Sequence, residues 1–115
     1  MSEQSQFCQP ITHEELGTNY LDWTGNDDSA RNHHGIVRQR RGSVGLRLCW
    51  KASKESQSRF IGCFRLSIGE LLSEGFIRPD PKPGYVRVRV SHASDNALYL
   101  QANSKGPRIL LGRFF

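Results

Sequence analysis

Arginine and tyrosine alternate with valine in the stretch that begins at Gly84, which reads Gly-Tyr-Val-Arg-Val-Arg-Val-Ser-His. The period of two predicts a half-buried strand, with the valines on one face and Tyr85, Arg87 and Arg89 on the other. Guanidinium groups bind phosphates through paired hydrogen bonds, and tyrosine rings stack on unpaired bases. The pattern therefore predicts a sheet face that binds nucleic acid.

Two further strands are expected to extend this face. The return strand Ala97–Gln101 alternates so that Tyr99 and Gln101 lie opposite its leucines, and in Val44–Lys51 the side chains of Arg47 and Lys51 alternate with apolar ones. If these strands pair with the first, all of their polar side chains share one surface. The alternative interpretation is an ordinary sheet face in contact with water, which shows the same alternation.

A second basic cluster, Arg38-Gln39-Arg40-Arg41, has enough positive charge to bind a phosphate backbone. The alternative for this cluster is a solvated charged turn. The predicted nucleic-acid contacts are Arg38, Arg40, Arg41, Arg47, Lys51, Tyr85, Arg87, Arg89 and Tyr99.

The charge of the chain is divided unevenly. The formal net charge is +5, but residues 1–30 hold six acidic and no basic side chains, and all 16 Lys and Arg residues follow them. A body this basic attracts polyanions, so DNA or RNA is the expected partner. The acidic N-terminus could lie across the basic face and compete with that ligand.

Residue types that support catalysis or metal binding are present without the spacing that either requires. The histidines and cysteines form no C-x-x-C or H-x-x-x-H pair, so no metal site is expected. His92, near Asp95, is the best single candidate for an acid–base group, but it belongs to no catalytic signature, and no glycine-rich phosphate loop is present. We expect a non-enzymatic protein without a cofactor.

The cysteines and the hydropathy indicate a compartment. The three cysteines are an odd number with no close pair, which is typical of reduced thiols in a cytoplasmic protein. No apolar run approaches the length of a membrane span, and the polar N-terminus does not resemble a secretory signal. We expect a cytoplasmic protein with no membrane partner.

The elements that must position these residues are mostly strands. A helix is predicted near residues 67–75, with Ser67 as its N-cap and Gly75 at its end, and a short N-terminal helix is indicated by the capping-box spacing of Thr12 and Glu15. The expected fold class is α+β with about five or six strands, either as a mainly antiparallel β-sheet or as a small barrel of the oligonucleotide-binding (OB) type.

Three segments are expected to be irregular, namely residues 1–10, 24–32 and 78–84, because they are polar, turn-rich or proline-rich. Together with the charge division, this predicts an acidic and partly irregular N-terminal segment, 1–34, and a basic β-rich domain, 35–115.

Val37-Arg38-Gln39-Arg40 and Ile61-Gly62-Cys63-Phe64 resemble the V-R-x-R and L-G-x-F signatures of the plant ethylene-response-factor type of DNA-binding domain. The resemblance spans about 40 residues, and the alternation around Leu48 is out of phase with it. It implies a three-stranded antiparallel sheet backed by a helix, with Arg38, Arg40 and Arg47 as DNA contacts.

The C-terminal run Ile109-Leu110-Leu111-Gly112-Arg113-Phe114-Phe115 supports a second functional class. A strand with apolar residues on both faces can pair with a partner or lie in a dimer interface. The alternative function is thus a protein-interaction or structural module that forms a homodimer through residues 108–115. Simple packing of this strand into its own core would explain the same pattern.

Overall fold

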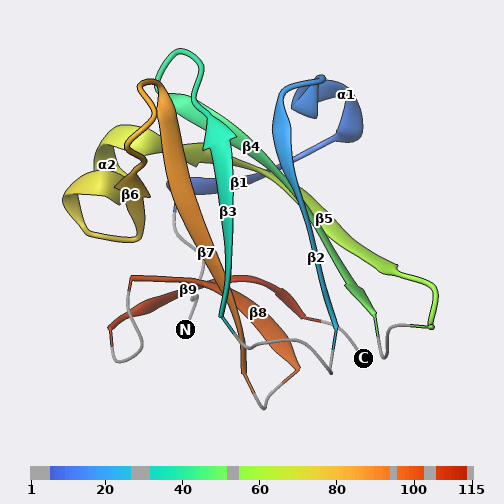
Figure 1. Cartoon of the computed structure of the whole chain (residues 1–115). Helices are drawn as coiled ribbons and strands as arrows, with labels where there is room; N and C mark the ends of the chain where they lie inside the picture. The colour runs from blue at the N-terminus through green and yellow to red at the C-terminus, as the bar shows by residue number, and fades with distance from the viewer. Residues whose placement is uncertain (1–5, 27–31, 52–54, 94–95, 103–105, 114–115) are drawn as a thin grey trace.

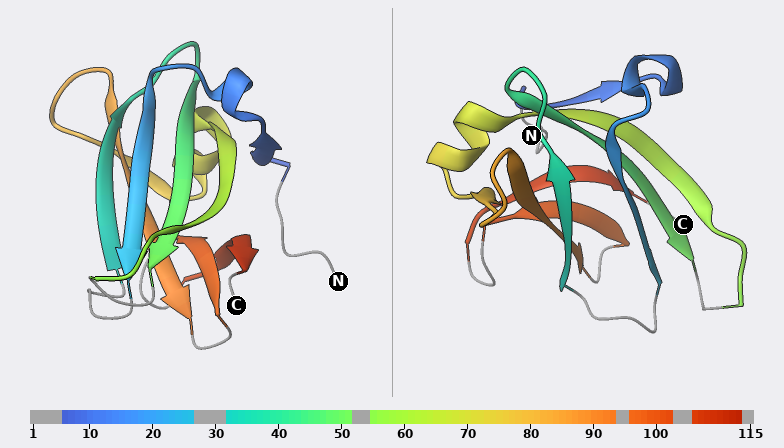
Figure 2. Two further views of the ribbon diagram at one scale, coloured as in Figure 1. Left: turned by 90° about the vertical axis from the view of Figure 1, so that its right-hand side faces the viewer. Right: turned by 45° about the horizontal axis from the view of Figure 1, so that its top comes forward.

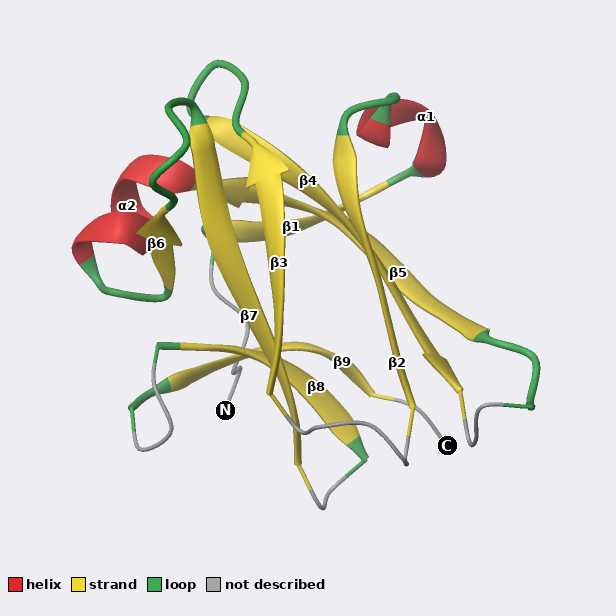
Figure 3. Ribbon diagram, viewed as in Figure 1, coloured by secondary structure: helices red, strands yellow, loops and turns green. Residues whose placement is uncertain are grey.

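A computed structural model describes residues 6–26, 32–51, 55–93, 96–102 and 106–113 (Figure 1). In this part of the chain there are nine strands and two short helices, so strands dominate (Figure 3). The elements are β1 (Cys8–Ile11), α1 (His13–Leu16), β2 (Tyr20–Asn26), β3 (Asn32–Arg38), β4 (Ser43–Lys51), β5 (Arg59–Ser67), α2 (Ile68–Ser73), β6 (Ile77–Pro79), β7 (Tyr85–Ala93), β8 (Ala97–Gln101) and β9 (Arg108–Arg113).

The strands form two sheets. Sheet A has the order β1-β5-β4-β2, and sheet B has the order β3-β7-β8-β9, with β6 as an additional partner of β7. All pairs are antiparallel except β2 with β4, which are parallel because the intervening β3 belongs to the other sheet. The predicted α+β class with mainly antiparallel pairing is confirmed. Of the two arrangements considered, the described strands form open sheets and no closed barrel.

The core lies between the two sheets and follows from the alternation in their strands. Sheet A contributes leucines with no exposed surface, among them Leu46 and Leu48, and sheet B contributes Val88, Val90 and Leu100. Burial of one such side chain stabilises the fold by about 1.5–3 kcal/mol. Because these residues occupy every second position, the side chains between them must point outward.

Sheet A lies close to an edge strand of sheet B at two places, and a glycine lies at each approach. β2 runs beside β3 (Figure 2), where a Cβ atom on Gly35 would overlap the Leu21 side chain. β9 approaches β5, where a Cβ on Gly112 would lie 2.7 Å from Cγ2 of Ile61. The absence of a side chain at these two positions therefore permits the close approach of the sheets at both places.

Both predicted helices are present and short. Thr12 and Glu15 form the expected capping box: the Glu15 amide donates to Thr12 Oγ1 at 3.1 Å, and the Thr12 amide donates to Glu15 Oε1 at 3.0 Å. α2 begins at Ile68 as predicted, although Ser67 makes no side-chain cap, and Gly75 follows it with a φ of 83°.

The expectation that residues 1–10, 24–32 and 78–84 are irregular is wrong in part. β1 pairs with β5, β2 extends to Asn26, and β6 includes Arg78 and Pro79. β1 and β6 each pair with one strand only. A proline there, which lacks a backbone N–H, interrupts no hydrogen bonds to a strand on the other side. Residues 1–5 and 27–31 lie outside the described part of the chain.

The N-terminal segment contributes to the common core through Cys8 and Trp23, although its division from residues 35–115 by charge stays a prediction. The three-stranded sheet implied by the DNA-binding resemblance is not formed, because β3 lies in sheet B whereas β4 and β5 lie in sheet A. No helix in the described ranges is long and apolar enough to cross a membrane.

Candidate nucleic-acid interface

The outer face of sheet B carries several of the basic side chains that were predicted to contact nucleic acid. In β7 the valines at 86, 88 and 90 are buried, whereas Arg87 is exposed and Tyr85 and Arg89 are partly exposed. The predicted alternation of this strand is thus confirmed. Its arginines point away from the core, as a half-buried strand requires.

Neighbouring strands add arginines to the same face. Arg38 of β3 lies opposite Tyr85 in the ladder, and Arg78 of β6 lies opposite Arg87. Arg108 of β9 lies opposite Gln101 of β8. We call this surface the basic face. Its members are Arg38, Arg78, Tyr85, Arg87, Arg89 and Arg108.

Arg78 and Arg108 were not among the predicted contacts. Arg78 lies in a proline-rich segment that has no readable strand period, and only its partner β7 places it in the sheet. Arg108 begins the last strand, which was interpreted from its sequence only by the apolar residues that follow. Only the pairing registers of β6 with β7 and of β9 with β8 assign Arg78 and Arg108 to the basic face, and the local sequence pattern does not.

Within the described ranges, one carboxylate forms an ion pair with this arginine group. Asp80 Oδ1 accepts from Nε of Arg87 at 2.9 Å, and Asp80 Oδ2 accepts from the Lys82 backbone amide at 2.9 Å. The backbone hydrogen bond and the Arg87 guanidinium hold the pKa of Asp80 below its ordinary value. The ion pair is made through Nε of Arg87.

The two predicted stacking tyrosines differ in exposure. Tyr85 is partly exposed, with Lys82 Nζ 4.4 Å from the centre of its ring. Tyr99 is only 5% exposed, and the Arg108 guanidinium lies 4.2 Å from its ring centre. The expectation of an open ring at Tyr99 is therefore wrong, because β8 is a central strand with all five residues buried.

The turn after β3 places Arg40 and Arg41 beside the end of the basic face. Gln39 donates its amide to the Gly84 carbonyl at 2.9 Å, which ties this turn to the start of β7. Arg41 adopts a φ of 53°, in the left-handed region, and both arginines are exposed. The cluster Arg38–Arg41 thus combines a strand end and a turn.

The remaining predicted contacts, Arg47 and Lys51, do not share this surface. Both belong to β4, which is in sheet A, so the expectation of a single surface is wrong. Nη1 of Arg47 lies 3.2 Å from Asp22 Oδ1 and 3.1 Å from Cys49 Sγ, and its guanidinium lies 5.5 Å from the centre of the Phe60 ring. The alternation of residue types in β4 predicted which face of the strand carries Arg47 and Lys51, but it could not show which sheet the strand joins.

The acidic N-terminal residues that the structure describes also lie on the side of sheet A. Asp22 of β2 pairs with Arg47, and the Glu15 side chain caps α1. Neither carboxylate lies over the basic face. The other acids of the first 30 residues include Glu3, Asp27 and Asp28, which are outside the described ranges.

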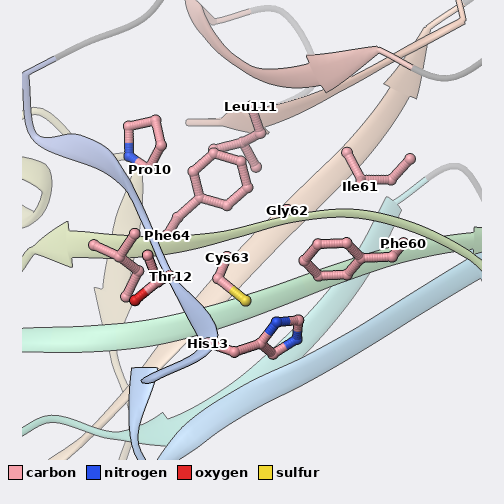
Figure 4. A pocket seen from close by; sticks show the side chains of 10 residues that line it. Pro10, Thr12, His13, Phe60, Ile61, Gly62, Cys63, Phe64 and Leu111 are labelled. Atoms are coloured by element: carbon pink, nitrogen blue, oxygen red, sulfur yellow. The ribbon is translucent and has the colours of Figure 1, made fainter. Parts of the chain in front are cut away.

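A separate hollow of about 460 Å³ lies where β1 diverges from β5 (Figure 4). His13 stacks on Phe60 with ring centres 4.8 Å apart, and the Cys63 thiol also lines the hollow. Burial raises the pKa of Cys63, so its sulfur stays protonated at neutral pH and is a poor nucleophile. The Cys63 thiol is therefore not activated for nucleophilic attack.

The predicted acid–base candidate, His92, is partly exposed. His92 packs against Trp50 with ring centres 4.7 Å apart at one end of the core, and Asp95 lies outside the described ranges. Across the described ranges, no group of three or more His, Cys, Asp or Glu side chains could hold a metal ion.

Comparison with protein-family models, with curated proteins and with solved structures gave no match to this chain.

Proposed function

We propose that this protein is a non-enzymatic nucleic-acid-binding module whose basic face contacts the phosphates of single-stranded DNA or RNA. The observation that carries the proposal is the gathering of Arg38, Arg78, Arg87, Arg89 and Arg108 on one side of sheet B. Only one carboxylate of the described chain, Asp80, forms an ion pair with them. An arginine group with so little internal neutralisation attracts a polyanion.

The shape of the face favours a single strand. Tyr85 and Arg89 are four positions apart on β7, which places them about 13 Å apart along the strand. Arginines along such a ladder can follow a flexible backbone, and the partly exposed Tyr85 ring can stack on a base. Arg40 and Arg41 would extend the track at the end nearest Gly84.

A titration followed by fluorescence anisotropy tests this proposal, with labelled DNA and RNA oligonucleotides at two salt concentrations. With four phosphate contacts on a single strand, log K falls with log salt with a slope of about −2.8, so affinity falls about 50-fold between roughly 50 and 200 mM salt. No binding in low salt overturns the proposal.

Matched variants locate the site. Arg38→Gln removes a charge from the basic face, whereas Arg59→Gln removes one from β5 in sheet A, and both residues are exposed. The first change should weaken binding and reduce the salt slope by about 0.7. The second should leave the slope nearly unchanged. Equal effects would mean that charge alone, and not the face, governs binding.

The second candidate, a homodimer through residues 108–115, rests on β9 being an edge strand of sheet B. Its apolar side chains Ile109 and Leu111 are buried in the chain's own core, so Leu110, which is partly exposed, is the apolar residue of Arg108–Arg113 that a partner can contact. Light scattering over a range of concentrations tests it. A monomer mass that Leu110→Lys does not change excludes the dimer.

The three cysteines are unpaired and buried, which is compatible with a reducing compartment. On this ground we place the proposed activity in the cytoplasm. Fractionation with a tagged chain tests the location.

A further inference from the structure

A small cavity lies in the basic face where β6 and β8 meet along one edge of β7. β6 pairs with β7 as far as Val88, and β8 pairs with it from Val90, so Arg89 lies at the junction of the two ladders. The cavity holds about 110 Å³. Its walls are Phe76, Arg78, Arg87, Arg89, Gln101 and Ala102. We call it the arginine cavity.

The positive charge of the arginine cavity is only partly compensated by the described residues. Three guanidinium groups line it, and Asp80 supplies one negative charge through Nε of Arg87. Its formal charge is therefore about +2, since arginine stays protonated at all relevant pH values. Arg78 and Arg87 lie directly opposite one another, an arrangement that repels unless an anion lies between the two groups.

Arg89 supplies a second, independent observation. Its Nε atom is buried and has no hydrogen-bond partner within the described chain. Buried donors are almost always paired, and leaving a charged one without an acceptor destabilises the fold more than leaving a neutral one. A site that holds such a donor beside two other guanidiniums is built to receive an acceptor from a ligand.

We propose that the arginine cavity binds the phosphate monoester at the end of a nucleic-acid strand; this inference rests on the proposed function. A monoester carries a charge of about −1.5 to −2 at pH 7, which matches the cavity, whereas each internal phosphodiester carries about −1. The planar guanidiniums offer paired donors to the phosphate oxygens, and the Gln101 amide can add a neutral one. The apolar wall of Phe76 and Ala102 reduces competition from water.

The test compares one oligonucleotide sequence in three forms, with a 5′-hydroxyl, a 5′-phosphate or a 3′-phosphate, by competition against a labelled strand. At least one phosphorylated form should bind about tenfold more tightly than the form with hydroxyl ends. Equal affinity of the three forms overturns the inference and leaves the proposed function intact.

Two variants and a pH series identify the site. Arg89→Gln, and independently the exposed Arg78→Gln, should abolish the preference for a phosphate end, whereas Arg59→Gln should preserve it. The preference should also weaken as the pH falls through about 6, where a monoester gains its second proton. A preference that survives in both cavity variants, or that does not change with pH, contradicts the assignment.

Failure of the proposed function would be visible separately, as no binding by any of the three oligonucleotides. Thymidine 5′-monophosphate, with thymidine as its control, then probes the cavity alone by NMR titration. Saturable binding of the monophosphate that Arg89→Gln removes supports the cavity as a phosphate-monoester site. Absence of binding to the wild-type protein overturns it.

Discussion

Arg78 and Arg87 lie directly opposite one another where β6 pairs with β7. Like charges in this position destabilise an antiparallel pair, while Asp80 neutralises only the Arg87 side. The pair is best understood as a stability cost that accompanies an anion-binding surface. Its cost should be measurable in the stability of the free protein.

Replacing Arg78 by threonine should stabilise the free protein. The change removes the repulsion and introduces a residue with high strand propensity, so the free energy of unfolding should rise by about 0.2–1 kcal/mol. Urea denaturation monitored by tryptophan fluorescence measures it. The same variant should bind polyanions more weakly. In an Arg87→Gln background the part of the stabilisation that comes from relieved repulsion should vanish, so the gain should be smaller. A loss of stability on Arg78→Thr alone would contradict the interpretation.

Asp80 should make stability depend on pH in the acid range. Its pKa is lower in the folded protein than the ordinary value of 3.8, so its contribution is complete above that value and is lost as the pH falls through the folded value. Asp80→Asn keeps an acceptor for the Lys82 amide but loses the charge. It should lower Tm at pH 6, and the difference from wild type should disappear in strong acid. A constant difference would contradict this.

The approach of β9 to β5 should not tolerate a side chain at Gly112. A Cβ there would lie 2.7 Å from Ile61 Cγ2, so Gly112→Ala should destabilise the protein by about 1–3 kcal/mol. Gly69 in α2 is the matched control, because nothing lies within 4 Å of its Cβ position and alanine favours helices by about 0.5–1 kcal/mol. Ile61→Ala should partly rescue Gly112→Ala in a double-mutant cycle. Equal effects at the two glycines would contradict the close approach.

The three cysteines should be unreactive in the native protein. Burial raises the pKa of the Cys8 thiol to about 12 and also raises those of Cys49 and Cys63. Few thiolates are then present at about pH 8, so Ellman's reagent should react slowly until the chain unfolds in guanidinium chloride. Rapid reaction of one native thiol, identified by mass spectrometry, would show that the site is more open than described.

The local elements could be predicted because their signals are local. The alternating valines of β7 and the capping box at Thr12 and Glu15 both appear as expected. β1 and β6 could not be predicted, since strands of four and three residues that contain proline show no period and are fixed by their partners.

The candidate site was predicted in part for a related reason. A period of two shows which face of a strand is buried but not which sheet the strand joins. Arg47 and Arg87 have the same local pattern, yet they lie in different sheets. The reverse holds for Arg78, which has no local pattern and reaches the basic face only through its register with Arg87.

The division of consecutive strands between two sheets affects how the chain folds. β1 pairs with β5 and β2 with β4, although β3 between them belongs to sheet B. In sheet A only β4 and β5 are consecutive strands that pair with one another. The outer strands β1 and β2 pair with strands that follow much later in the sequence. Such non-local pairing slows the search for the native topology, typically to milliseconds or seconds, because loop-closure entropy is lost before the contacts form.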